Sequence, residues 1–497
     1  MNSSTKVSGT SYVKANKKKW LMLIAVLQIV IVIILYLIMD AMSVRYTDKL
    51  IAWGVVSLVV IGWIVLSQVS LTKDFDIFTI MMLLAAPFYF GHHYVLMLGK
   101  DVPWDSAIKL VKEETNLFSG AFILISLLLV YVGYLSSKPV LHQENNPNCL
   151  TSGIAIGNSE KDSKVFRNLG IIIFFVTVIP TMYYRIFEIT LNFTYGYIEG
   201  NKLRASISGF AYIGAFVSDW FVSSIYILLI TNSKKKASNV FFFMVSLGYC
   251  CLYLAGGSRY AVIEIATGLL LIRHVWVKRI NRRKMIMLSI VGIFALLVFS
   301  ALPEIRLSIH NTNNKTNLVG SEIGNILDTG LLTNVLEETG ITYATITNVL
   351  DKCPSVVPHS FGYSILGFFI LLLPSFLRFG LDLEAFSVSS TFSGLMLGSK
   401  MVGGYGSSYI AEAYYNFGYL IIVYLIIFGR FLCRISNKLK YFSRTRDAGK
   451  FFLLIYLCGR IVFTIRTDLV SIGRYYVYFA LLPYIVYRMA IRNTSLR

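Results

Sequence analysis

Charged residues are scarce in this chain. Only 14% of its 497 residues are charged, whereas 56% are hydrophobic. The hydrophobic residues gather in runs of about 20, and each run is long enough to cross the ~30 Å hydrocarbon core of a bilayer. The composition therefore excludes an ordinary soluble domain and predicts an all-α integral membrane protein.

The residue patterns of several common site types are also missing. Of the six cysteines only Cys353 lies in a predicted outer loop, so no disulfide framework is available there. None of the six histidines stands at metal-ligand spacing with another histidine, a cysteine or a carboxylate. The chain has no phosphate loop, no GxSxG and no HExxH motif. We therefore expect neither a metal site nor a cofactor.

The apolar runs predict about 12 transmembrane helices, with both termini on the same side of the membrane. The predicted spans lie at 20–39, 50–70, 77–98, 116–136, 168–190, 207–231, 239–256, 260–276, 285–302, 409–429, 451–465 and 475–490.

The net charge of +20 follows from the distribution of lysine and arginine across the membrane. With the N-terminus in the cytoplasm, 28 of the 46 Lys and Arg residues fall on the cytoplasmic side, 15 outside and three within spans. This bias is typical of the positive-inside rule, which sets the orientation of membrane proteins. The excess of basic over acidic residues thus reflects the membrane topology, and we predict no nucleic-acid partner.

The topology divides the chain into three parts. Residues 1–302 form a nine-span membrane part, 303–408 one large outer loop, and 409–497 a three-span membrane part. Segment 361–379 is apolar enough to span, but a crossing there would move the cations of 430–450 to the outer face. It is therefore predicted to be a re-entrant or interfacial helix, broken at Pro374.

Arginines recur on the predicted outer face. They occur in the turn GGSR, in PEIRLSIH after the ninth span, and in GRIVFTIRTDLVSIGR around the last two spans. A guanidinium group pairs bidentately with phosphate oxygens, which suits binding of a diphosphate. A single outer arginine can equally contact lipid headgroups, but a charge inside a span is costly unless it is paired. The candidate diphosphate ligands are Arg259, Arg306, Arg460, Arg466 and Arg474.

A polar stripe opens the predicted span at 409–429. Ser408 is predicted to cap this helix, and Glu412, Tyr415, Asn416 and Tyr419 would then share one face. Alternatively, Glu412 only complements the positive N-terminus of the helix.

The candidates for a catalytic base and for ligands of the acceptor lie in this stripe and in the large loop. Glu412 is the first candidate for a catalytic base, because a helix holds it at fixed geometry. His310 is the second, although a loop histidine is more often only solvated. Tyr415 and Asn416 are the candidate ligands of acceptor hydroxyls.

These motifs, in this order, resemble the Wzy-type O-antigen polymerases. The resemblance rests on GGSRY, the Pro-broken segment ILLLPSFLRF in a long outer loop, GSSYIAEAYYNFG and the Arg/Asp-containing final turn. It implies a glycosyltransferase in the bacterial inner membrane that polymerises undecaprenyl-diphosphate-linked oligosaccharide repeat units on the periplasmic face. It also implies a fold like that of lipid-sugar glycosyltransferases, with a flippase and a chain-length regulator as partners. Such a donor has its own leaving group, so the site needs cations and one base.

Two other functions remain open from the sequence. A polysaccharide flippase or transporter also fits many spans with intramembrane charges, although its repeated halves and short loops are not found here. A ligase that joins O-antigen to a lipid core would share the donor and the fold type.

Overall fold

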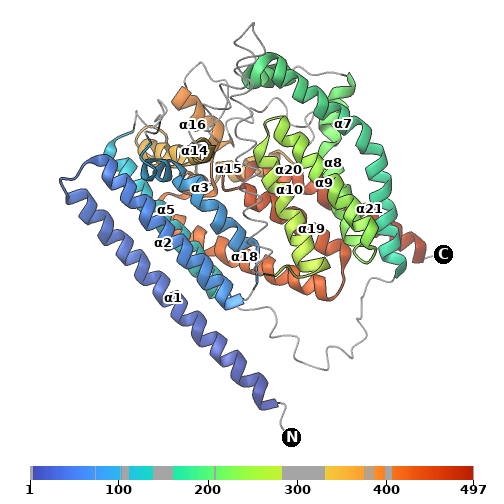
Figure 1. Cartoon of the computed structure of the whole chain (residues 1–497), viewed down its shortest axis with the longest axis horizontal. Helices are drawn as coiled ribbons and strands as arrows, with labels where there is room; N and C mark the ends of the chain where they lie inside the picture. The colour runs from blue at the N-terminus through green and yellow to red at the C-terminus, as the bar shows by residue number, and fades with distance from the viewer. Residues whose placement is uncertain are drawn as a thin grey trace. The chain divides into compact units, whose positions relative to one another are not determined.

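The computed structural model describes residues 4–72, 74–100, 102, 111–137, 160–205, 209–281, 331–373, 377, 381, 386–397 and 406–495. Every regular element in these ranges is a helix, which confirms the predicted all-α class. The chain divides into two compact units, each built from segments far apart in the sequence (Figure 1).

The first unit consists of Met1–Asn145, Leu336–Asn437 and Thr464–Ser471. Among its helices α1, α2, α3 and α5 pack against one another, as Figure 1 shows. Its helices are α1 (Ser4–Ala41), α2 (Tyr46–Thr72), α3 (Ile77–Met97), α5 (Glu113–Ser136), most of α14 (Leu331–Lys352), α15 (Tyr363–Ile370), α16 (Val388–Leu397), α17 (Tyr409–Phe417), the short 3₁₀ turn Gly418–Leu420 and most of α18 (Ile421–Arg444).

The second unit consists of Asn146–Val335, Lys438–Phe463 and Ile472–Arg497. Here α7 packs along α8, and α10 packs against α9 and α19. Its helices are α7 (Glu160–Ala205), α8 (Gly209–Thr231), α9 (Lys236–Ala255), α10 (Arg259–Leu271) with the π-helical turns Ile272–Val277, α19 (Ala448–Phe463), most of α20 (Val470–Tyr476), the π-helical turn Val477–Leu481 and α21 (Leu482–Ser495).

Nine helices in the described ranges are long and apolar enough to cross a membrane. They coincide with the first eight predicted spans and with the one at 409–429. The predicted span at 285–302 lies outside the described residues, and α19 and α20–α21 occupy the last two predicted spans. The total of 12 and the division at 302 and 408 stay predictions.

Part of the predicted outer loop packs tightly in the first unit. Helix α14 crosses α3 at Gly91 and Gly340, where neither residue leaves room for a Cβ atom. Nearby, Tyr343 donates a hydrogen bond to the Asn116 carbonyl at 2.5 Å. This loop segment is therefore anchored to helices that can span a membrane.

Helix α15 covers the first half of the apolar segment 361–379. Its eight residues extend about 12 Å, far less than the ~30 Å of a hydrocarbon core. It begins after Gly362, whose φ of +92° favours glycine, and it ends at Ile370, whereas Pro374 lies outside the described residues. The re-entrant or interfacial course of segment 361–379 stays a prediction.

The helix that opens at Ser408 is shorter than predicted. The Ser408 side chain accepts a hydrogen bond from the Ala411 N–H at 3.0 Å, so the predicted cap is confirmed. The helix then ends at Phe417, because Gly418 adopts a positive φ of +54°. Tyr419 falls in the following 3₁₀ turn and is exposed, so it does not continue the stripe of Glu412 and Asn416.

Candidate functional site

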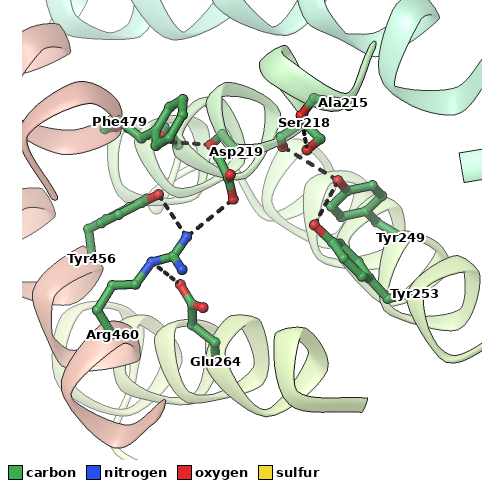
Figure 2. A network of polar contacts seen from close by, with 10 residues as sticks. Ala215, Ser218, Asp219, Tyr249, Tyr253, Glu264, Tyr456, Arg460 and Phe479 are labelled. Atoms are coloured by element: carbon green, nitrogen blue, oxygen red, sulfur yellow. Dashed lines mark hydrogen bonds and ion pairs between the residues drawn. The ribbon is translucent and has the colours of Figure 1, made fainter. Parts of the chain in front are cut away.

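A buried ion cluster joins three helices of the second unit (Figure 2). The Nη2 atom of Arg460 lies 3.2 Å from Oδ1 of Asp219, and its Nε atom lies 2.7 Å from Oε1 of Glu264. One guanidinium group thus faces two carboxylates, one from α8 and one from α10. An isolated charge in a spanning helix is costly, and mutual pairing reduces that cost.

Helix packing and aromatic rings fix the position of Arg460. Gly459 lets α19 approach α10 closely, since a Cβ atom there would lie 3.1 Å from Glu264. The guanidinium group stacks 3.8 Å from the ring centre of Tyr475 and also contacts the Tyr456 hydroxyl at 3.4 Å. A guanidinium held on an aromatic face and between two carboxylates has little freedom to move.

The two carboxylates of this cluster keep unused oxygen atoms. Side-chain exposure is 22% for Asp219, 13% for Glu264 and 9% for Arg460. Within the described residues, Oδ2 of Asp219 and Oε2 of Glu264 have no hydrogen-bond partner. The cluster is therefore formally anionic, with part of its charge accessible.

Two tyrosines connect this cluster to a second one. The Tyr249 hydroxyl lies 3.4 Å from both the Ser218 carbonyl, next to Asp219, and the Tyr253 hydroxyl (Figure 2). The Tyr253 ring in turn lies 3.6 Å below the guanidinium carbon of Arg185. Polar and aromatic groups thus run continuously from α10 and α19 through α8 and α9 to α7.

The second cluster pairs two arginines with one carboxylate. Arg185 donates to Oε2 of Glu188 at 2.6 Å, and Arg204 pairs with the other oxygen of the same carboxylate. Glu188 and Arg185 are buried, whereas the Arg204 side chain is 25% exposed. The two guanidinium groups thus meet at one buried carboxylate.

The turn GGSR lies against this second cluster. The Asn192 amide donates to the Gly256 carbonyl at 2.6 Å, and the Glu188 carboxyl group borders the same glycine. Gly257 has a φ of +89°, so the turn requires glycine there. Arg259 follows as the first residue of α10. The turn that borders Glu188 therefore leads directly into Arg259.

Of the predicted diphosphate ligands, three lie in the second unit. The Tyr260 and Phe463 rings lie 6.1 Å apart, so Arg259 begins α10 beside the end of α19, the helix that carries Arg460. Arg474 is exposed in α20. Arg460 faces carboxylates, so its proposed role at a phosphate stays a prediction. Arg306 and the second base candidate, His310, lie outside the described residues.

Arg466 belongs to the first unit. Its Nη1 atom donates to the Glu338 carbonyl at 2.9 Å, and its own carbonyl accepts from the Ser407 N–H at 3.0 Å. Gly406 packs on it with a φ of +79°. The side chain thus holds α14 next to the segment that leads into α17.

Glu412 forms the centre of a polar network in the first unit. It is 2% exposed, and its oxygens accept hydrogen bonds from the Ser364 hydroxyl and the Leu469 N–H, both at 2.7 Å. Its role as a base stays a prediction, since a sugar hydroxyl could not reach this buried carboxylate without a movement of the surrounding chain. In this structure Glu412 joins α17 to α15 and to the segment after α19.

Asn416 uses its whole amide group in the same network. Its oxygen accepts from the Ser360 hydroxyl at 2.5 Å and from the Gly362 N–H at 3.1 Å. Its nitrogen donates to the Ser364 hydroxyl at 2.7 Å and to the Glu412 carbonyl at 2.9 Å. Tyr415 is half-buried with its ring against Phe392. Their roles as acceptor ligands also stay predictions.

Asp468 is the second buried carboxylate near this network. It accepts from the Ser387 hydroxyl at 2.6 Å, which ties the start of α16 to the segment after α19. Burial raises the pKa of Asp468, and its hydrogen bonds offset only part of that effect.

The sequence analysis did not select Asp219, Glu264, Glu188 or Arg204. A signal was present for the first three, because each is an acidic residue within an apolar run of a predicted span. Among the described residues, no group of three or more His, Cys, Asp or Glu side chains could hold a metal ion.

Comparison with known proteins identifies the family. The family described as O-antigen polysaccharide polymerase Wzy matches residues 20–494, nearly the whole chain. No curated protein sequence and no solved structure matches significantly. The family match confirms the predicted polymerase and decides against a flippase or a ligase. The chain belongs to the O-antigen polysaccharide polymerase Wzy family, whose multi-pass membrane enzymes join repeat units into O-antigen.

Proposed function

We propose that this polymerase uses repeat units carried on undecaprenyl diphosphate as the glycosyl donor. The observation that supports this donor is the pair of guanidinium groups at the GGSR turn, where Arg185 and Arg204 both contact the carboxylate of Glu188 and Arg259 begins the next helix. Guanidinium groups bind phosphate oxygens bidentately, and they stabilise the charge that develops as a diphosphate leaves.

The chemistry of this donor explains what the site needs. An acceptor hydroxyl attacks the anomeric carbon, the bond from that carbon to the diphosphate breaks, and the lipid diphosphate leaves with the electron pair. The leaving group requires cations, and the hydroxyl requires a base. A nucleotide and a metal are not required by this scheme.

We propose the periplasmic face of the inner membrane as the place of the reaction. The excess of lysine and arginine on the other side of the predicted spans supports this orientation. A charged lipid diphosphate does not cross a bilayer unaided, so a flippase would have to deliver the donor; a chain-length regulator is a further proposed partner. Arg306 and Arg466 are further proposed ligands of the diphosphate.

Substitution of Arg259 and Arg474 tests the donor. Arg259→Ala and Arg474→Ala should each lower the polymerisation rate on the order of 10²–10³-fold, and lysine should restore only part of it. The measurements are binding of a purified lipid-diphosphate repeat unit and electrophoresis of the polymer. Arg45→Ala, which removes an exposed arginine paired with Asp48, is the matched control. Full polymer from both variants would rule out a diphosphate clamp at these positions.

Labelling of introduced cysteines tests the orientation. An impermeant thiol reagent added to intact cells should label cysteines placed at surface positions within 318–350 and 385–400, away from the buried face of α14. Labelling from the cytoplasmic side alone would move the proposed site to the other face.

A further inference from the structure

We infer that Asp219 is the base that removes the proton from the acceptor hydroxyl, and that Arg460 positions its carboxylate. This inference rests on the proposed lipid-diphosphate donor. It adds the residue that deprotonates the acceptor, and it assigns that role to a different carboxylate from Glu412.

Accessibility separates Asp219 from the other buried carboxylates. Both oxygens of Glu412 accept hydrogen bonds, and both oxygens of Glu188 pair with arginines. Asp219 is bonded through Oδ1 alone, its Oδ2 has no partner within the described residues, and its side chain is 22% exposed. A base needs an oxygen that the substrate can reach, and Asp219 meets this requirement best, because Glu412 is only 2% exposed and Glu188 only 1%.

The exposed part of Asp219 lies at the depth of a membrane-spanning helix. Asp219 lies near the middle of α8, a helix long and apolar enough to span the membrane. An ionised side chain at that depth does not face lipid, because the hydrocarbon would leave its charge unsolvated. Its free oxygen therefore faces water or substrate.

The position of Asp219 matches the proposed donor site. Ser218 lies beside Tyr249, which precedes the end of α9 by six residues, or about 9 Å along the helix. The GGSR turn and Arg259 come directly after that end. A diphosphate at the turn would thus extend its sugar toward Asp219, across the aromatic surface of Tyr249 and Tyr253.

Asp219 is also a better candidate than Glu264. Arg460 contacts Glu264 at 2.7 Å but Asp219 at 3.2 Å, so Asp219 is held less tightly, and it is the more exposed of the two. Glu264 neutralises Arg460, while the Tyr475 ring fixes the guanidinium plane. Arg460 can then orient Asp219 without fully quenching its negative charge.

The proposed step is balanced. The acceptor oxygen forms a bond to the anomeric carbon of the donor, and its proton moves to Oδ2 of Asp219. The bond from the anomeric carbon to the diphosphate breaks, and the lipid diphosphate leaves with the electron pair. Asp219 then returns the proton to water.

Kinetics of purified variants in lipid nanodiscs test this inference. The probe is a lipid-diphosphate-linked repeat unit, and Asp48→Asn, an exposed carboxylate paired with Arg45, is the matched control. Asp219→Asn should bind the donor within about twofold of wild type and keep its KM, whereas kcat should fall on the order of 10²–10⁴-fold. Asp219→Asn leaves Arg460 paired one-to-one with Glu264, so the fold should survive.

Two more variants distinguish the loss of a base from a purely structural effect. In Asp219→Ala, added formate should restore part of kcat, because a small carboxylate can enter the vacated position; a structural role predicts no recovery. If Asp219→Asn does not remain monodisperse, Asp219→Glu decides, since displacement of a base that must lie within ~3 Å of the hydroxyl should lower kcat at least several-fold.

The outcomes separate the inference from the proposed function. A wild-type protein that neither binds nor consumes the lipid-diphosphate probe contradicts the donor. A wild type that polymerises the probe, together with Asp219→Asn at a similar kcat, overturns the assignment of Asp219 alone. If Asp219→Asn is not monodisperse, an unchanged kcat in Asp219→Glu likewise overturns the assignment of Asp219.

Discussion

The two units each contain a buried carboxylate network, but the networks differ in how completely their oxygens are bonded. In the first unit, Glu412 and Asn416 are bonded to hydroxyls and backbone groups through every polar atom of their side chains. In the second unit, Asp219 and Glu264 face one guanidinium group and each keeps a free oxygen within the described residues.

This difference separates residues that attach parts of the chain to one another from residues that are available for a reaction. A fully bonded neutral or singly charged network stabilises one arrangement of the chain, and here it attaches α15 and the segment after α19 to α17. A partly bonded charged cluster costs stability, so its presence indicates a function. This argument supports the proposal that Asp219 of the second unit takes part in the reaction.

The largest effect is expected from Arg460→Ala. It leaves Asp219 and Glu264 close together without a cation, and breaking a buried ion pair in this way costs about 3–5 kcal/mol. The yield of monodisperse protein after detergent extraction should fall strongly.

A triple variant sharpens this test. Arg460→Met with Asp219→Asn and Glu264→Gln removes all three charges, so the folded yield should recover while polymerisation stays lost. Recovery of both would mean that the cluster is only structural.

A smaller effect is expected from Glu264→Gln. Arg460 then has Asp219 as its single carboxylate partner, which holds Asp219 more tightly and weakens it as a base. We expect kcat to fall about tenfold, which corresponds to ~1.4 kcal/mol in the barrier, with little change in thermal stability. An unchanged kcat would mean that Glu264 does not tune Asp219.

Glu412 provides the matching test in the first unit. Glu412→Gln keeps an acceptor for the Leu469 N–H and a polar partner for Ser364, so polymer should form nearly as in wild type. Glu412→Ala leaves these donors unsatisfied and should cost about 1–3 kcal/mol in thermal unfolding. A folded Glu412→Gln protein without polymer would return the base to Glu412, and His310→Ala would then be the next comparison.

The sequence predicted the helices better than it predicted the partners of the charged residues. Runs of about 20 apolar residues predicted the nine helices of the described ranges that are long and apolar enough to cross a membrane, because this signal is local. The full length of α7, from Glu160 to Ala205, was not predicted, since its C-terminal part is rich in polar and glycine residues. Likewise α14 is amphipathic and was assigned to a loop.

The prediction of candidate site residues was limited in the same way, because their partners are distant in the sequence. Arg460 was selected because a charge within a span is conspicuous, but its partner Asp219 lies 241 positions away in the sequence. No local pattern joins the two. Glu412 was selected for its position at a helix start, and only the tertiary structure shows that Ser364 and Leu469 occupy both its oxygens.

The smallest effect is expected from Asp468→Asn. Burial raises the pKa of Asp468 above its value in the unfolded chain, so the folded state binds this proton more tightly. This contribution to stability is complete below the unfolded pKa of ~4 and is lost as the pH rises through the folded pKa. Asparagine keeps an acceptor for the Ser387 hydroxyl without the charge, so at neutral pH the variant should unfold on the order of 1–4 °C higher than wild type. The difference should shrink as the pH is lowered toward 4, with thermal unfolding in detergent as the measurement. A variant that is less stable than wild type at neutral pH would show that the ionised Asp468 stabilises the first unit, and that its network tolerates charge as the second unit does.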